Sequence, residues 1–198
     1  MEILTHKPGI LEKGLKQAAI KLLVCACLWL TGSMTHFAQA HTEDDLLLKA
    51  AFIYNFAKFT QWPSEVFQEQ TSPLNLCITG EDELVKKLEQ LAGKTIQQHP
   101  VVVQDLQQAQ KIEDCQILYV AMSEDKNFLK ILSPIRNQPV LTISELPLFA
   151  QSGGIIKLYK EKEQTHFIIN LAASRQSGLE INSRLLKLAK VINHETVK

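Results

Sequence analysis

The stretch LNLCITGEDELVKKLEQLAG, residues 74–93, decides the fold class of this chain. Its first six residues form an apolar run typical of a buried strand, and Gly80-Glu81-Asp82 follows as a turn. A helix is predicted over 83–91, where leucines recur on one face, and Gly93 suits the C-cap of that helix. A buried strand followed directly by an amphipathic helix is the building unit of an α/β fold.

The same alternation continues outward from this unit. A further strand is predicted within 95–103, most clearly at 101–103. Other strands are predicted over 115–122, 140–143, 155–159 and 167–171, and further helices over 46–59, 128–135 and 181–192. Strands separated by short helices imply βαβ units, whereas a polar tip at 161–164 joins the last two strands as an antiparallel hairpin at one edge. The predicted fold is a single α/β domain with a mostly parallel sheet, a C-terminal antiparallel hairpin and flanking helices.

The predicted helix over 46–59 is apolar on nearly all sides, so we expect the rest of the domain to cover it. Asp44 and Asp45 suit its N-terminus, where carboxylates meet the positive end of the helix dipole. Pro63 ends the helical region because the residue before a proline is pushed out of the helical conformation. Tyr54 and Phe59 are candidates for a partner contact face, with plain core packing as the alternative.

The first forty residues have the composition of a secretion signal. Four lysines precede a short apolar run at 22–30, and Ala38-Gln39-Ala40 matches the small-residue pattern of a cleavage site. The run is too short for a comfortable membrane span, and an uncleaved N-terminal anchor is the alternative. We therefore expect a signal peptide over 1–40, a mature domain over 41–198, a periplasmic location and no membrane span after cleavage.

Cleavage changes both the charge and the cysteine content. The full chain has 21 basic and 21 acidic residues, and residues 1–40 remove four lysines and two glutamates. The mature chain is slightly acidic, which argues against a nucleic-acid partner. Only Cys77 and Cys115 remain, and in an oxidising compartment they point to one disulfide, with two buried free thiols as the alternative. Bridging within adjacent parallel strands is strained, so we place at least one of them at a strand end.

No motif in the sequence identifies an enzyme or a metal site. The chain has no Gly-rich dinucleotide or phosphate loop, no nucleophile elbow and no zinc-binding helix motif. His41, His99, His166 and His194 are isolated in the sequence, whereas a metal site needs convergent ligands. We therefore expect no catalytic residue, no metal and no cofactor.

Polar residues follow two of the predicted strands. Gly80, Glu81 and Asp82 follow one strand, and Ser123 and Glu124 follow another. Ligands of open α/β sheets bind outside the carboxyl ends of the strands, so these residues are candidates for a small-molecule or partner contact. Helix capping is the alternative, because Asp and Ser in such loops accept hydrogen bonds from the first backbone N–H groups.

A second candidate site lies at the end of the last predicted strand. Asn170 is near the end of that strand and Arg175 lies beyond it, and both side chains can contact a polar ligand or a partner. An ordinary surface ion pair is the alternative for the arginine.

Six segments of the chain resemble the YfiR/HmsC-like family of exported proteins, in order and at natural spacing. They are KAAFIYNFAKFTQWP at 49–63, LNLCITGEDEL at 74–84, LAGKTIQQHPVVV at 91–103, CQILYVAMSE at 115–124, PVLTISELPLFAQSGGIIKLY at 139–159 and FIINLAASRQSGLEINSRLLKLAKVI at 167–192. The resemblance implies a compact α/β sandwich with a disulfide that matches Cys77 and Cys115. A second cysteine pair, present in some members, is missing from the mature chain.

The resemblance also implies a function. It points to a periplasmic regulator, not an enzyme, that represses an inner-membrane diguanylate cyclase by binding its periplasmic sensor domain, which lowers cyclic di-GMP and biofilm signalling. The expected partner is that cyclase, and a homodimer is a further candidate assembly. The alternative is a periplasmic small-molecule-binding sensor module without a cyclase partner, which a ligand would stabilise against heat.

Overall fold

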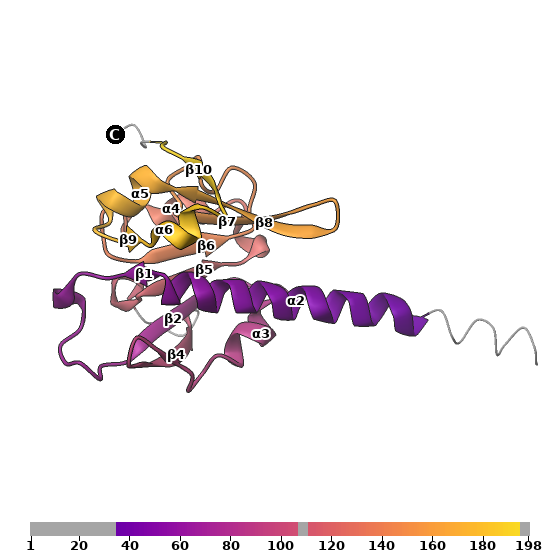
Figure 1. The fold of residues 1–198 in the computed structure, drawn as a ribbon, viewed down its shortest axis with the longest axis horizontal. Helices are drawn as coiled ribbons and strands as arrows, with labels where there is room; N and C mark the ends of the chain where they lie inside the picture. Colours follow the sequence, from indigo (N-terminus) through magenta and orange to yellow (C-terminus); the bar gives the residue numbers. More distant parts are fainter. Residues whose placement is uncertain (1–34, 107–110, 195–198) are drawn as a thin grey trace, which may run out of the picture. The chain divides into compact units, whose positions relative to one another are not determined.

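A computed structural model describes residues 35–106 and 111–194 of the chain and builds most of them around an eight-stranded sheet. The strands are β1 (Thr60–Gln61), β2 (Leu74–Thr79), β3 (Thr95–Ile96), β4 (His99–Asp105), β5 (Ile117–Val120), β6 (Leu141–Ser144), β7 (Ile156–Glu161), β8 (Gln164–Asn170), β9 (Glu180–Ile181) and β10 (Lys190–Ile192). The α-helices are α2 (Thr35–Lys58), α3 (Val85–Glu89), α4 (Phe128–Leu132), α5 (Leu171–Gln176) and α6 (Ser183–Leu186), and the 3-10 turns are η1 (Ser64–Val66), η3 (Ile112–Asp114) and η4 (Met122–Glu124). Figure 1 labels most of these elements.

The chain divides into two compact units, Met1–Asp44 and Asp45–Lys198. The sheet and the side chains that pack on it belong to the second unit. The lysines and the apolar run of the predicted signal peptide lie outside the described residues, whereas the predicted cleavage site falls within α2.

The strand order in the sheet is β10-β8-β7-β6-β5-β2-β4-β3, and most neighbours run parallel. The antiparallel pairs are β7 with β8 and β3 with β4. The predicted α/β class with a mostly parallel sheet is thereby confirmed. The C-terminal hairpin of β7 and β8 is also present, but β10 pairs with β8 on its outer side and takes the edge position. The direction of winding reverses between β2 and β5.

Apolar side chains cover both faces of the sheet. In β5, Ile117 and Tyr119 join one buried cluster, whereas Leu118 and Val120 join another on the opposite face. Helices α2 and α3 contribute to the first cluster, and α4 contributes to the second. Burial on both faces explains why β5 is apolar at every position, as is typical of a parallel strand between two helical layers.

Helix α2 differs from its prediction at the N-terminus and in its coverage. It begins at Thr35, so Asp44 and Asp45 lie inside the helix and not at its start. One side of α2 is buried, with Phe56 completely inaccessible and its ring centroid 4.8 Å from that of Phe167. Leu47 and Leu48, however, are each 48% exposed. The expectation that the domain covers this helix nearly all round is therefore wrong.

The segment 95–103 forms a hairpin of β3 and β4, and its most strand-like part, 101–103, lies in β4 as predicted. Gln97 and Gln98 form the turn, with φ angles of 51° and 75°. The amide of Gln97 donates to the carbonyl of Lys58, the last residue of α2, at 3.2 Å and to the carbonyl of Thr60 at 2.7 Å. Gly93 is not the C-cap of α3, because that helix ends at Glu89 and Gly93 lies in the following turns.

The helix predicted over 181–192 is wrong in most of its length. Its residues form the end of β9, the one-turn helix α6 and the strand β10. Asn182 caps α6 by accepting a hydrogen bond from the N–H of Arg184 at 2.9 Å. Helix α5 was not predicted. It follows β8 directly and shows no long apolar stripe, because it has only six residues.

Candidate functional site

A disulfide joins Cys77 in β2 to Cys115, just before β5. The Cα atoms are 5.8 Å apart, and both side chains are buried. In the strand register Cys77 lies opposite Leu118, so the bridge runs diagonally to the residue that leads into β5. This placement agrees with the expectation that one cysteine lies at a strand end. The bridge ties together the two strands between which the winding reverses.

The polar residues after β2 and β5 meet at the carboxyl ends of these strands. The Ser123 hydroxyl accepts a hydrogen bond from the N–H of Glu81 at 2.8 Å. Gly80 has a φ of 79°, and a Cβ atom at this position would collide with Ser123 and Glu124. The two predicted groups of residues therefore lie together. Ser123 and Glu124 lie against Gly80 at the strand ends, where an open α/β sheet commonly binds its ligand.

Asp82 is occupied on both carboxylate oxygens. Oδ1 accepts from the backbone N–H groups of Leu84 and Val85, at 2.9 and 3.3 Å. Oδ2 accepts from the Tyr119 hydroxyl at 2.7 Å and from the N–H of Met122 at 3.2 Å. This arrangement supports the capping interpretation of the cluster, because the carboxylate holds the start of α3 against the end of β5.

Because of Tyr119, the stability of the domain is expected to fall as the pH rises into the alkaline range. Burial of the hydroxyl raises the pKa of Tyr119 well above its ordinary value of 10.0, and the charge and hydrogen bond of Asp82 raise it further. The folded state therefore keeps a proton that the unfolded state releases above pH 10.0. The stabilisation is fully present below that pH and decreases as the pH rises.

We expect urea unfolding to show this dependence. The free energy of unfolding should fall as the pH rises from about 9 to about 11, and Tyr119→Phe should reduce the slope because phenylalanine releases no proton. At neutral pH the same substitution should cost about 2 kcal/mol, since it leaves a carboxylate oxygen without its strongest donor. Equal slopes for the two proteins would contradict this assignment.

Asn170 and Arg175 are not brought together into one site. Asn170 is completely buried; its amide donates to the carbonyls of Ala150 at 2.8 Å and His194 at 2.9 Å. Its oxygen accepts from the N–H of Ala173 at 3.2 Å and caps α5. Arg175 is exposed on α5, where it lines a surface hollow with Gln176. Asn170 is thus a structural link between β8, α5 and the C-terminal segment.

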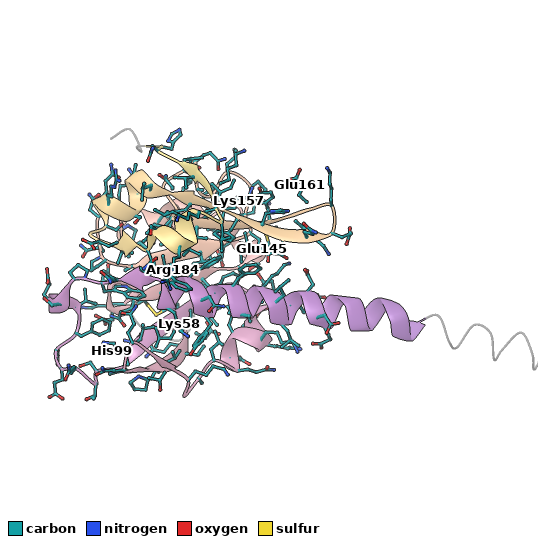
Figure 2. All side chains as sticks on the ribbon, viewed as in Figure 1. Lys58, His99, Glu145, Lys157, Glu161 and Arg184 are labelled. Atoms are coloured by element: carbon teal, nitrogen blue, oxygen red, sulfur yellow. A yellow bond between two sulfur atoms is a disulfide. The ribbon has the colours of Figure 1, made fainter. Side chains whose placement is uncertain are left out.

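An ion-pair cluster holds α2 to the sheet. The Lys49 ammonium lies 3.2 Å from Asp45 and 3.0 Å from Glu145, which follows β6. Burial alone would lower the pKa of Lys49, but the hydrogen bonds and charges of Glu145 and Asp45 outweigh it and raise the pKa. Figure 2 labels Glu145 and Lys58, which lie on opposite sides of α2. One side of α2 therefore carries the ion pair with Glu145, and the other side carries Lys58 and Tyr54.

The other side of α2 borders a groove of about 560 Å³, which we call the α2–α3 groove. Its lining residues come from α2, from α3 and from the segment that leads into β3: Leu47, Ala50, Ala51, Tyr54, Lys87, Gln90, Leu91, Lys94 and Thr95. The Tyr54 hydroxyl donates to the carbonyl of Thr95 at 3.0 Å, which links two of these lining residues. The Lys58 ammonium lies 5.5 Å from the centroid of the Tyr54 ring.

Sequence reasoning identified only Tyr54 among these lining residues. The available signal was the spacing of Leu47, Ala51, Tyr54 and Lys58, which recur along one side of a helix. Because that side lies next to the buried face of the helix, the apolar residues of both together predict a helix that the domain covers on nearly all sides. The groove forms because α3 lies beside α2, and the spacing of residues in α2 does not predict where α3 lies.

A family model described as YfiR/HmsC-like matches residues 47–190, which is more than half of the chain. The chain belongs to the YfiR/HmsC-like family. The matched range contains both bridge cysteines and every residue that lines the α2–α3 groove.

Membership in the YfiR/HmsC-like family sets the broad class of function. The family is periplasmic and regulatory rather than catalytic, and it suggests a role in cyclic di-GMP signalling. Within residues 35–106 and 111–194, no helix is long and apolar enough to cross a membrane. The same two stretches hold no group of three or more His, Cys, Asp or Glu side chains placed to bind a metal ion.

Proposed function

We propose that this YfiR/HmsC-like protein represses an inner-membrane diguanylate cyclase by binding the cyclase's periplasmic sensor domain. Repression lowers cyclic di-GMP and thereby restrains biofilm formation. The observation that carries the proposal is the family match over residues 47–190. The sequence features of an export signal are consistent with a protein that acts outside the cytoplasm.

The packing of the strand ends favours a protein contact over a small-molecule pocket. At the carboxyl ends of β2 and β5, Ser123 and Glu124 pack against Gly80. The carboxylate of Asp82 is already hydrogen-bonded on both oxygens. A ligand at this point would have to displace interactions that the domain makes with itself. The α2–α3 groove, in contrast, is open at the surface.

Repression by binding needs a difference in affinity. A protein that bound the active and inactive forms of a cyclase with equal affinity would not change the equilibrium between these forms, however tightly it bound. The repressor must therefore recognise a surface that the periplasmic sensor domain presents mainly in its inactive form. A rigid domain suits this task because less conformational entropy is lost on binding, and the Cys77–Cys115 bridge contributes to that rigidity.

A pull-down tests the proposal directly. The mature protein, tagged at its C-terminus and purified from the periplasm, is incubated with detergent-solubilised inner membranes. We expect retention of a diguanylate cyclase with a periplasmic domain, and competition by untagged protein. An unrelated periplasmic protein carrying the same tag is the control. Retention of no cyclase under conditions where the bait is folded would count against the proposal.

A further inference from the structure

The α2–α3 groove combines an apolar floor with a basic rim. Ala50 and Leu91 lie on the floor and are 5% and 7% exposed. Ala51 is exposed, and its short side chain leaves the hollow open. Leu47 stands beside it with nearly half of its surface exposed. An exposed apolar patch framed by polar groups is typical of a docking site.

The charged residues that line the groove are lysines. Lys87 and Lys94 line the groove from the α3 side, and Lys58 lies over the Tyr54 ring on the α2 side. Among the described residues that line the groove, none is acidic. The mature domain as a whole is slightly acidic, so this basic rim is a local feature. Its charge complements a negatively charged partner surface.

The same charges weigh against two other occupants. Residues 1–34 hold four lysines and two glutamates, so the chain's own N-terminal segment would bring positive charge to a positive rim. A second copy docked groove against groove would set the same lysines against each other. Like charges placed together across an interface oppose binding.

We propose that the α2–α3 groove binds an acidic amphipathic segment of a partner protein. Apolar side chains of that segment would enter between Leu47 and Leu91, and its carboxylates would face Lys94 and Lys58. A helix whose apolar face lies in a hydrophobic groove is a recurring mode of peptide recognition. The proposal rests on the proposed function for the identity of the partner, which is then the cyclase's periplasmic domain.

The first test uses two amphipathic peptides and the folded mature protein. Both peptides carry leucine on one face; one carries glutamate and the other lysine on the opposite face. Fluorescence anisotropy should detect binding of the glutamate peptide only, with an affinity that falls as salt rises. Lys94→Glu should weaken binding about fivefold to tenfold, whereas Lys130→Glu on α4 should leave it unchanged. Equal binding of both peptides, or no binding of either, overturns the proposal.

The second test fills the groove by substitution. Ala51→Arg adds bulk without reversing the charge, and Leu129→Arg on α4 is the matched control on an exposed helix position. Both variants should unfold at the same temperature as the wild type within a few degrees. Only Ala51→Arg should lose peptide binding. A solution dimer that Ala51→Arg breaks would instead place a second copy in the groove and would overturn the proposal.

An experiment in cells distinguishes failure of this inference from failure of the proposed function. In a strain that lacks the protein, cyclic di-GMP is measured after complementation with wild type, Ala51→Arg or Leu129→Arg. If only Ala51→Arg fails to lower the nucleotide, both proposals are supported. If all three lower it equally, the groove is not the docking surface and the repressor function stands. If loss of the protein changes nothing, the repressor function fails and the peptide test alone decides the groove.

Discussion

Removal of the disulfide is expected to lower the free energy of unfolding by about 4 kcal/mol, because a closed loop of this length restricts the unfolded chain by that amount in the chain-entropy model. Cys77 and Cys115 are separated by 38 positions. The bridge also lies in a buried apolar cluster with Leu118 and Val120, so its loss loosens packing between β2 and β5. A domain of ordinary stability would lose a large part of its margin.

The variant Cys77→Ala/Cys115→Ala isolates this effect, because alanine leaves no buried hydroxyl. Urea unfolding at neutral pH should give a lower midpoint for the variant than for the oxidised wild type. Addition of dithiothreitol should destabilise the wild type and leave the variant unchanged, which serves as the internal control. In cells, we expect weaker repression because less folded protein accumulates. Equal midpoints for the variant and the oxidised wild type would show that the bridge contributes little.

Asn170→Ala is expected to cost about 3 kcal/mol of stability, because a lost cap costs about 1 kcal/mol and a buried polar group left without a partner costs about 1–3 kcal/mol. The substitution removes the cap of α5 and leaves the carbonyl of Ala150 without its donor. The link to His194, and with it the segment beyond β10, is lost as well.

Arg175→Ala is the control for this substitution. The arginine is exposed on α5, so its removal should change the free energy of unfolding by no more than about 0.5 kcal/mol. Thermal unfolding followed by circular dichroism measures both variants. If Asn170 served mainly as a ligand contact, Asn170→Ala would melt close to the wild type. That result would contradict the structural role assigned to it.

The parts of the fold that the sequence predicted are those in which local pattern and burial agree. Strands β2 and β5 are buried on both faces, so continuous apolar runs identify them. The register between them was not predictable, because it depends on backbone bonds between distant residues. The bridge between Cys77 and Cys115 could be expected from export and cysteine count, and the structure contains it.

The C-terminal region shows why periodicity alone misleads. Leu185, Leu188 and Ile192 have helical spacing, yet only Ser183–Leu186 is helical. Lys190–Ile192 instead pairs in parallel with β8, through bonds that no local pattern records. The turn at Gln97 was hidden for another reason. Its left-handed backbone is typical of glycine and asparagine, so glutamine gave no turn signal.

The candidate site was predictable in its residues but not in its role. Residues after β2 and β5 converge because the carboxyl ends of parallel strands share one edge of the sheet. Whether Asp82 would serve a ligand or cap a helix depended on the position of Tyr119, which supplies its strongest hydrogen bond. The α2–α3 groove forms because two helices lie side by side. The spacing between these helices cannot be predicted from the sequence of either one.

Cellular cyclic di-GMP, compared between exported and retained forms of the protein, tests the central claim most directly. A strain that lacks the protein is complemented with the full chain or with a form that lacks residues 1–40 and stays in the cytoplasm. We expect the deletion to raise cyclic di-GMP, the full chain to lower it again, and the retained form to have no effect. An unchanged nucleotide level in the deletion strain, or equal repression by the retained form, would contradict a repressor that acts from the periplasm.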